Sequence, residues 1–162
     1  MGFKDNPIVY LTKKTWHFSS KKKIVLFTFL FFLANAVDFF WPLLIGKVLN
    51  IVQESGLNPE SFGSIIWILA IFPLLTIGFW AFHGPARIIE TKNAFMARAN
   101  YKKYLVDGVM SLPAAWHTDH HSGDTIDRIN KSSDALFEYS SHLFEVIQTV
   151  IRLIGSSAAL VY

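Results

Sequence analysis

The stretch from Ser111 to Ile129, SLPAAWHTDHHSGDTIDRI, holds the densest group of side chains that could bind a metal. It has three histidines in the pattern His-x-x-His-His and two aspartates close to them, namely His117, His120, His121, Asp119 and Asp124. Imidazole and carboxylate groups are ligands of zinc and of non-haem iron. The stretch therefore raises the hypothesis of a membrane-bound metalloenzyme that uses a histidine box.

Three interpretations of this stretch compete. A di-iron site needs several histidine boxes near a membrane face, and the 6 histidines of the chain form only one. A zinc site is geometrically possible, because His117 and His121 are spaced to share one face of a helix. The third interpretation is a docking surface, in which Trp116 is an apolar anchor with a polar rim of His and Asp. The small number of metal ligands favours docking.

The composition of the chain is that of a membrane protein. Charged residues make up 17% of the 162 residues, against about 25% in soluble domains, and the mean hydropathy is +0.35. The chain has no Cys, which excludes disulfides and thiolate metal ligands within it. The net charge is +3, and the basic residues lie beside apolar runs. They predict a partner surface of lipid headgroups and no nucleic acid.

Two apolar runs are long enough to be membrane spans. The first covers residues 24–45 and the second residues 65–82, and a helix of about 20 residues crosses a bilayer core. Pro42 predicts a kink late in the first span. Residues 50–64, between the runs, predict a short polar turn.

The distribution of lysine orients the two spans. The leader, residues 1–23, has six lysines, and PIVYLTKKTWHFSS within it predicts an interfacial helix. The turn has none beyond Lys47 at its boundary, and basic residues return after the second span. By the positive-inside rule, the N-terminus and the loop 83–142 are cytoplasmic and the protein is multi-pass in the cell membrane.

The cytoplasmic loop predicts a helical hairpin. Its first helix should end before Pro113, because the residue before a proline disfavours helix. Its apolar positions are Ile88, Phe95, Ala99, Val106 and Val109. The second helix should be capped by Asp124 or Thr125 and run to Arg152 without a break. Its predicted heptad seam consists of Ile126, Ile129, Ser133, Leu136, Ser140, Leu143, Ile147, Val150 and Ile154.

Two arms of about 45 Å each would then hold the histidine stretch away from the membrane. A third span should begin at about residue 143. Because the residues after Arg152 cover only about half a bilayer core, we expect the chain to be a fragment of a longer protein. The fold class predicted is therefore an all-α membrane protein with an interfacial helix, two spans, a long helical hairpin and the start of a third span.

Two polar residues lie within the first span. Asp38 follows Asn35 by one helical turn. A carboxylate inside a membrane is costly and is by default a functional hypothesis. Asn35 and Asp38 are therefore candidates for a polar translocation path.

The stretch from Tyr104 to Leu136, YLVDGVMSLPAAWHTDHHSGDTIDRINKSSDAL, resembles the first intracellular loop of exporter-type ABC transporters. The family has a Leu-Pro-like pair, an aromatic, a short linker, and then Gly and Ser/Asp-Arg before its third span. The matching residues are Leu112, Pro113, Trp116, Gly123, Asp127 and Arg128. One departure is Ser132, where the family often has an Asp; the nearby acid is Asp134.

The resemblance implies that this stretch carries the first coupling helix, which docks on nucleotide-binding domains. The implied contact residues are Ala115, Trp116, His117, Thr118, Asp119, His120 and His121. It further implies a homo- or heterodimer that uses ATP and Mg when complete. This chain has no Gly-x-x-x-x-Gly-Lys-Ser/Thr motif, so neither an ATPase site nor a cofactor of its own is assigned to it. The alternatives are the metalloenzyme and a non-catalytic membrane scaffold.

The topology is open to a direct test in a chain without native Cys. We expect Asn58→Cys to react with a membrane-impermeant maleimide in intact cells and Lys103→Cys to react only after the cells are lysed. The reason is the lysine asymmetry, which places position 58 outside and position 103 in the cytoplasm. The reverse pattern of labelling would contradict both the topology and the assignment of the loop.

Overall fold

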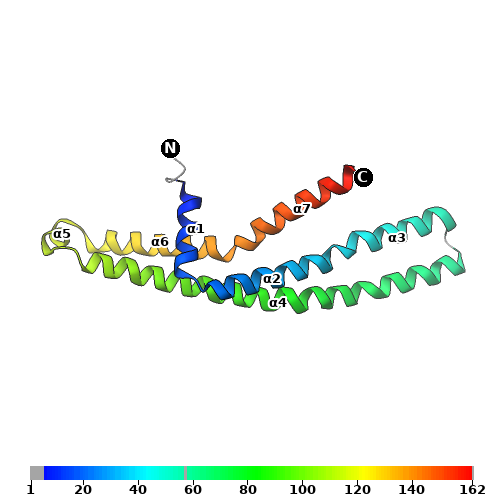
Figure 1. Cartoon of the computed structure of the whole chain (residues 1–162), viewed down its shortest axis with the longest axis horizontal. Helices are drawn as coiled ribbons and strands as arrows, with labels where there is room; N and C mark the ends of the chain where they lie inside the picture. Colours follow the sequence, from blue (N-terminus) through cyan, green and yellow to red (C-terminus); the bar gives the residue numbers. More distant parts are fainter. Residues whose placement is uncertain (1–5, 57, 162) are drawn as a thin grey trace. The chain divides into compact units, whose positions relative to one another are not determined.

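The computed structural model describes residues 6–56 and 58–161, and these residues are helical almost throughout (Figure 1). They contain no strand, which confirms the all-α prediction. The helices are α1 (Pro7–Phe18), α2 (Lys21–Asp38), α3 (Phe40–Ser55), α4 (Pro59–Met110), α5 (Ala114–Asp119), α6 (Ser122–Ser141) and α7 (Leu143–Val161).

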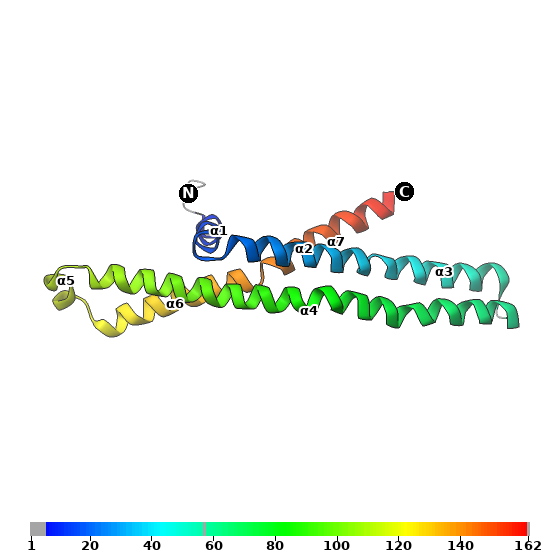
Figure 2. The same cartoon turned by 60° about the horizontal axis from the view of Figure 1, so that its bottom comes forward.

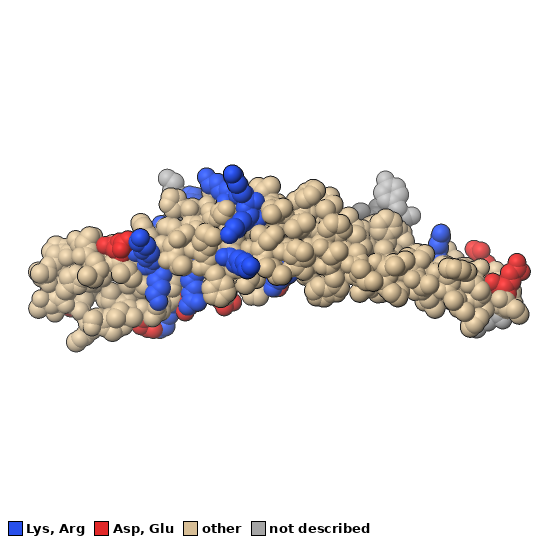
Figure 3. Space-filling model, turned by 90° about the horizontal axis from the view of Figure 1, so that it is seen from below, with Lys and Arg blue, Asp and Glu red and all other residues tan. Residues whose placement is uncertain are grey.

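The chain divides into two compact units. We call Leu26–Arg87 the apolar unit, and the residues before and after it the hairpin unit. Two helical stretches, Lys21–Ser55 and Pro59–Met110, are long and apolar enough to cross a membrane. Figure 3 shows that Lys and Arg side chains on the face drawn gather over the hairpin unit, whereas most of the apolar unit's surface there carries no charge.

The first predicted span is interrupted within the apolar unit. α2 ends at Asp38 and α3 begins at Phe40, so the span predicted over residues 24–45 consists of two helices joined at Phe39, within the stretch Lys21–Ser55 that is long and apolar enough to cross a membrane. The last residue of α2, Asp38, lies four residues before Pro42. Proline has no N–H to donate to the carbonyl of residue 38, and its ring crowds that carbonyl. The break between the two helices therefore lies about one turn before the proline.

The turn between the spans is shorter than predicted, because residues 50–55 and 59–64 are helical. Gly56 has φ +66°, a backbone conformation that residues with a Cβ rarely adopt. The Asn58 Oδ1 accepts the backbone N–H of Ser61 at 2.8 Å, and Pro59 occupies the first position of α4. The polar residues between the two apolar runs therefore belong to the ends of α3 and α4 as well as to the turn between them.

Aromatic contacts hold the apolar unit together. In both views α2 and α3 run alongside the first part of α4 (Figures 1 and 2). The rings of Trp41 and Phe72 are 4.8 Å apart between their centroids, and those of Phe31 and His83 are 5.3 Å apart. Many large apolar side chains of this unit are exposed, up to 78% for Trp67. An exposed apolar surface of this kind is expected where the solvent is lipid.

The helix after the second span continues as predicted, and α4 ends at Met110, before Pro113. The apolar positions that indicated this helix do not form its buried face, because Ile88, Phe95, Ala99 and Val106 are exposed. The buried face of α4 in the hairpin unit is made of small and polar residues at helical spacing, namely Glu90, Asn93, Ala94, Ala97 and Tyr101. Small side chains let neighbouring helices approach closely, and in this part of α4 that outweighs the burial of large apolar groups.

The centre of the hairpin unit is Leu136 of α6, which is fully buried against Ala97 and Tyr101 of α4. An ion pair between Arg98 and Asp134 links the same two helices. Partly buried apolar residues pack around this centre, namely Leu11 and Phe18 of α1 and Leu105 of α4. α4 and α6 thus form the predicted hairpin.

The second arm is not the uninterrupted helix predicted over Asp124–Arg152, so the two arms are unequal. α6 ends at Ser141, and His142 has φ −112° and ψ 5°. The Ser140 hydroxyl donates to the Leu136 carbonyl at 2.6 Å, and the Ser141 hydroxyl donates to the Glu138 carbonyl at 3.2 Å. Hydroxyl bonds to carbonyls of the preceding turn bend helices. α7 begins at Leu143, where a third span is predicted, and that span stays a prediction.

Two other details of the second arm differ from expectation. α6 begins at Ser122 with His121 at the N-cap, so neither Asp124 nor Thr125 caps it. Within the predicted seam, Ser133, Leu136 and Ser140 are buried, whereas Ile126, Val150 and Ile154 are exposed. The side chain of Ile147 lies outside those that the structure describes. The heptad seam therefore holds only in the middle of α6.

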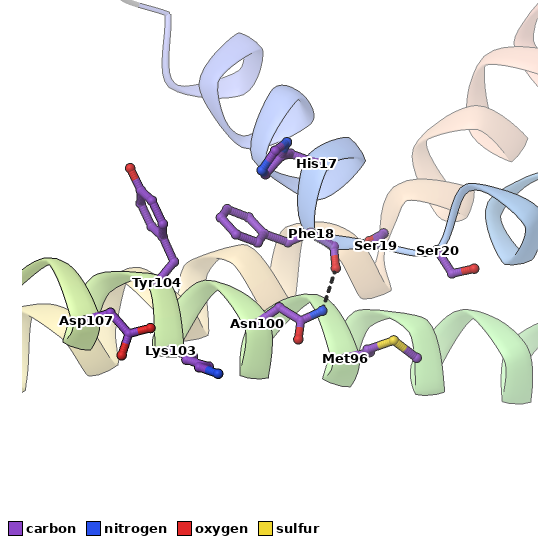
Figure 4. A pocket seen from close by; sticks show the side chains of 9 residues that line it. All are labelled: His17, Phe18, Ser19, Ser20, Met96, Asn100, Lys103, Tyr104 and Asp107. Atoms are coloured by element: carbon purple, nitrogen blue, oxygen red, sulfur yellow. Dashed lines mark hydrogen bonds between the residues drawn. The ribbon is translucent and has the colours of Figure 1, made fainter.

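The leader does form a helix, α1, whose N-terminus is capped by Asn6. Three hydroxyl pairs attach it to the hairpin: Tyr10 with Tyr101 at 3.0 Å, Thr12 with Tyr139 at 2.6 Å and Thr15 with Ser140 at 2.9 Å. At its C-terminal end, the Asn100 Nδ2 donates to the Phe18 carbonyl at 3.0 Å (Figure 4). The interfacial position of α1 stays a prediction.

Leu136→Ala should lower the stability of the hairpin strongly, whereas Ile126→Ala should not. A fully buried leucine typically costs about 2–5 kcal/mol when truncated to alanine, because a cavity remains. Ile126 is 58% exposed on the same helix and is a matched control, with an expected cost within about 0.5 kcal/mol. Thermal unfolding of the purified protein measures both. Equal losses of stability would contradict the packing described here.

Candidate functional site at the hairpin tip

The tip of the hairpin is the segment Pro113–His121, which connects α4 to α6 and contains α5 (Figure 1). Pro113 has ψ 150° and stands at the N-cap of α5. Its carbonyl accepts the backbone N–H of Trp116 at 2.9 Å. His120 ends α5 in an extended conformation, and His121 starts α6. The tip is thus a helix of six residues between Pro113 and His120, which are both extended.

The side chain of Trp116 is fixed by its neighbours within the tip. Its ring stacks on that of His120, with centroids 4.2 Å apart and planes 12° apart. His120 Nδ1 is 2.9 Å from the Trp116 carbonyl oxygen, which holds the imidazole in place. The His117 ring meets the indole edge-on at 5.3 Å between centroids. The indole is half-buried by these contacts, and part of it still faces solvent.

The remaining tip residues present polar groups around this aromatic stack. Thr118 is tied to the backbone, since its hydroxyl donates to the Ala114 carbonyl at 3.2 Å. The residues proposed from the resemblance as partner contacts are exposed except for Trp116, namely Ala115, His117, Thr118, Asp119, His120 and His121. A preformed aromatic group with a polar, exposed rim is the arrangement of an interface hot spot.

The zinc geometry considered from the sequence is wrong. α5 ends at Asp119, so His121 lies outside the helix and does not share a face with His117. The Nδ1 of His120 already contacts a backbone carbonyl. Among the residues that the structure describes, no group of three or more His, Cys, Asp or Glu side chains is arranged to hold a metal ion. The histidines are therefore side chains of a surface, not an assembled ligand set.

The charged residues after the tip pair along α6. Arg128 Nε binds Asp124 at 2.9 Å and Lys131 Nζ binds Asp127 at 2.6 Å, both at a spacing of four residues. The hydrogen bond to Asp127 is the main cause that raises the pKa of Lys131. Pairs this exposed add little stability, but they order the first turns of α6 directly behind the tip.

At Ser132 the sequence departs from the family pattern, and the structure shows how this position differs from the nearby acid Asp134. Ser132 is exposed, whereas Asp134 forms the ion pair with Arg98 across to α4. The Arg98 guanidinium also lies 5.8 Å from the centre of the Phe137 ring. Sequence reasoning did not find this link, because charge patterns alone do not show which helices face each other.

Asn35 and Asp38 lie together in the apolar unit and not with the tip. Both are half-buried, on the side of α2 that buries Phe31 and Ala34. The Asn35 Nδ2 donates to the Phe31 carbonyl at 2.9 Å. Asp38 is the last residue of α2, directly before the break. Their role in a translocation path stays a prediction.

His83 also belongs to this region and was missed. Its ring stacks on Phe79 at 4.7 Å between centroids and meets Trp80 edge-on at 5.5 Å. Together with Phe31 of α2, these residues surround the imidazole with aromatic rings. The spacing of four residues between Phe79 and His83 is the sequence signal that could have indicated the contact.

The fold and the tip define an all-α membrane protein with two long apolar helices and a helical hairpin. Comparison with known families identifies a match: the family described as ABC transporter transmembrane region matches residues 24–162. The chain belongs to this family. No curated protein and no solved structure matches the chain. The match includes the tip, and it confirms the resemblance drawn from the stretch Tyr104–Leu136.

Proposed function

We propose that this chain is part of the membrane domain of an ATP-driven exporter, and that the hairpin tip is the coupling helix that contacts a nucleotide-binding domain. The observation that carries the proposal is the tip itself. In a member of a transporter membrane-domain family, a short exposed helix presents a fixed Trp116 between two packed helices. Such a surface has no role in packing its own hairpin.

The construction behind the tip supports a mechanical role. Leu136 is fully buried between the arms, and the Arg98–Asp134 ion pair ties them together. α1 adds three hydroxyl pairs to the same arms. A displacement applied to the tip would therefore move the packed arms with it, because close-packed elements transmit strain.

In the complete transporter, ATP hydrolysis would take place on the nucleotide-binding domains and not on this chain. ATP and Mg²⁺ would bind the nucleotide-binding domains, since this chain lacks the phosphate-binding motif. The complete protein would be a homo- or heterodimer in the cell membrane, multi-pass, with the N-terminus in the cytoplasm. Solute would move outward by alternating access, and Asn35 and Asp38 would offer polar groups along its path.

Trp116→Ala in the complete transporter should uncouple ATP hydrolysis from transport. A central aromatic anchor of an interface is worth about 2 kcal/mol or more when truncated, so transport per ATP hydrolysed should fall by about tenfold or more. Changing His117, His120 and His121 together to Gln should have a milder effect, because glutamine keeps hydrogen-bonding groups at the rim. Parallel assays of ATPase activity and transport in proteoliposomes measure both variants.

The same pair of variants separates the proposal from a metalloenzyme. Stoichiometric metal in the purified protein, lost in the triple histidine variant together with activity, would show that the tip is a metal site and would contradict the coupling role. If Trp116→Ala assembles normally and its coupling is unchanged, the indole is not the anchor of the interface.

A further inference from the structure

A hollow of ≈600 Å³ lies beside α1, on the hairpin unit. It is lined by Thr12, Lys13, Trp16, His17 and Lys21. These residues are neither part of the tip nor of the family pattern discussed above. Lys13 and Lys21 are exposed, and Trp16 is 49% exposed.

The helix geometry explains why these residues converge. Thr12 and Trp16 are four residues apart, as are Lys13 and His17, so they form two adjacent rows on one side of α1. The chain then bends at Ser19 and Ser20, and α2 begins at Lys21. The Lys21 ammonium lies 5.6 Å from the centre of the Trp16 ring, so it returns to the same hollow.

The hollow is suited to an anion. No carboxylate lines it, and Lys13 and Lys21 have no ion pair among the residues that the structure describes. The imidazole of His17 adds a possible hydrogen-bond donor. The hydroxyl of Thr12 is already used, because it donates to the Ile8 carbonyl and pairs with Tyr139.

A second hollow, of ≈440 Å³, is also lined by His17 and serves as a comparison (Figure 4). Lys103 lies there with Asp107 four residues away on the same helix, and both line the hollow. The side-chain amide of Asn100, which also lines this hollow, donates a hydrogen bond to the Phe18 carbonyl. A carboxylate beside the only lysine makes this second hollow a poorer site for an anion than the hollow at Trp16.

We propose that the hollow at Trp16 binds the phosphate of an anionic phospholipid headgroup, with Lys13 and Lys21 as its cationic contacts. A lipid is favoured over a free phosphate by two observations. The apolar run of the first span begins at Ile24, directly after the lysines. An exposed indole lies beside the cations, and Trp is enriched where headgroups meet the hydrocarbon. Lysines next to a span attract anionic lipid.

One of the hydroxyl pairs that attach α1 to the hairpin, Thr15 with Ser140, involves no residue that lines the hollow. Thr15, which is buried against Ser140, points away from the row formed by Lys13 and His17. A headgroup can therefore occupy the hollow without breaking that contact. α1 would then contact the hairpin and a lipid at the same time.

The experiment uses the complete transporter in nanodiscs of phosphatidylcholine with a minor share of phosphatidylglycerol. Retained phosphatidylglycerol is measured by mass spectrometry across a titration of that lipid. The variant K13Q/K21Q removes two charges from the hollow. The control K22Q/K102Q removes two charges from exposed lysines of the same unit that do not line it. Because the first variant loses both cationic contacts of the hollow, it should need about tenfold more of the anionic lipid for equal retention, and the control should resemble the parent.

Three outcomes would overturn the proposal. Equal losses in both double variants would show general charge attraction without a site. Unchanged retention in K13Q/K21Q would show that the hollow binds no anionic lipid. Displacement of the lipid by millimolar glycerol phosphate, in the parent but not in K13Q/K21Q, would show a site for a soluble phosphate. Because lipid retention is measured without ATP, failure here is distinguishable from failure of the coupling role.

Discussion

Close packing of α1, α4 and α6 through small and hydroxyl-bearing residues is the interaction on which the rest of the hairpin unit depends. Leu136 is the one large aliphatic side chain in the described residues that is fully buried there, and the buried residues packed against it are Ala97 and Tyr101. Hydroxyl pairs such as Thr15–Ser140 then replace a broad apolar core. This packing holds the arms together, so that the tip is presented as a preformed surface.

The apolar unit obeys a different constraint, which is set by lipid. Backbone groups inside hydrocarbon must be bonded within the protein, so long helices are the available solution. The unit keeps its large apolar side chains outward and uses aromatic contacts such as Trp41–Phe72 between its helices. Polar groups, among them Asn35 and Asp38, lie on the inner side of α2. Both units thus use few large buried residues, for different physical reasons.

The sequence predicts the helices well because apolar run length and proline position act locally. It predicted two long apolar helices, the hairpin and the end of the hairpin's first arm before Pro113. The apolar spacing did not show which face of α4 is buried: Ile88 and Phe95 are exposed, whereas Ala97 and Tyr101 are buried. The break at His142 depends on serine hydroxyls bonding to backbone carbonyls, which a hydrophobic pattern does not register. At the tip, residue types indicated docking, but the stacking of Trp116 on His120 required coordinates.

The claim that the tip meets a nucleotide-binding domain is tested most directly by site-specific photo-cross-linking in the complete transporter. A benzophenone amino acid is placed at His117, which is exposed at the tip, or at Lys102, which is exposed on α4. Cross-linked peptides are then identified by mass spectrometry. The account predicts adducts with a nucleotide-binding domain from position 117 and none from position 102. Adducts from position 102 with none from position 117 would contradict it.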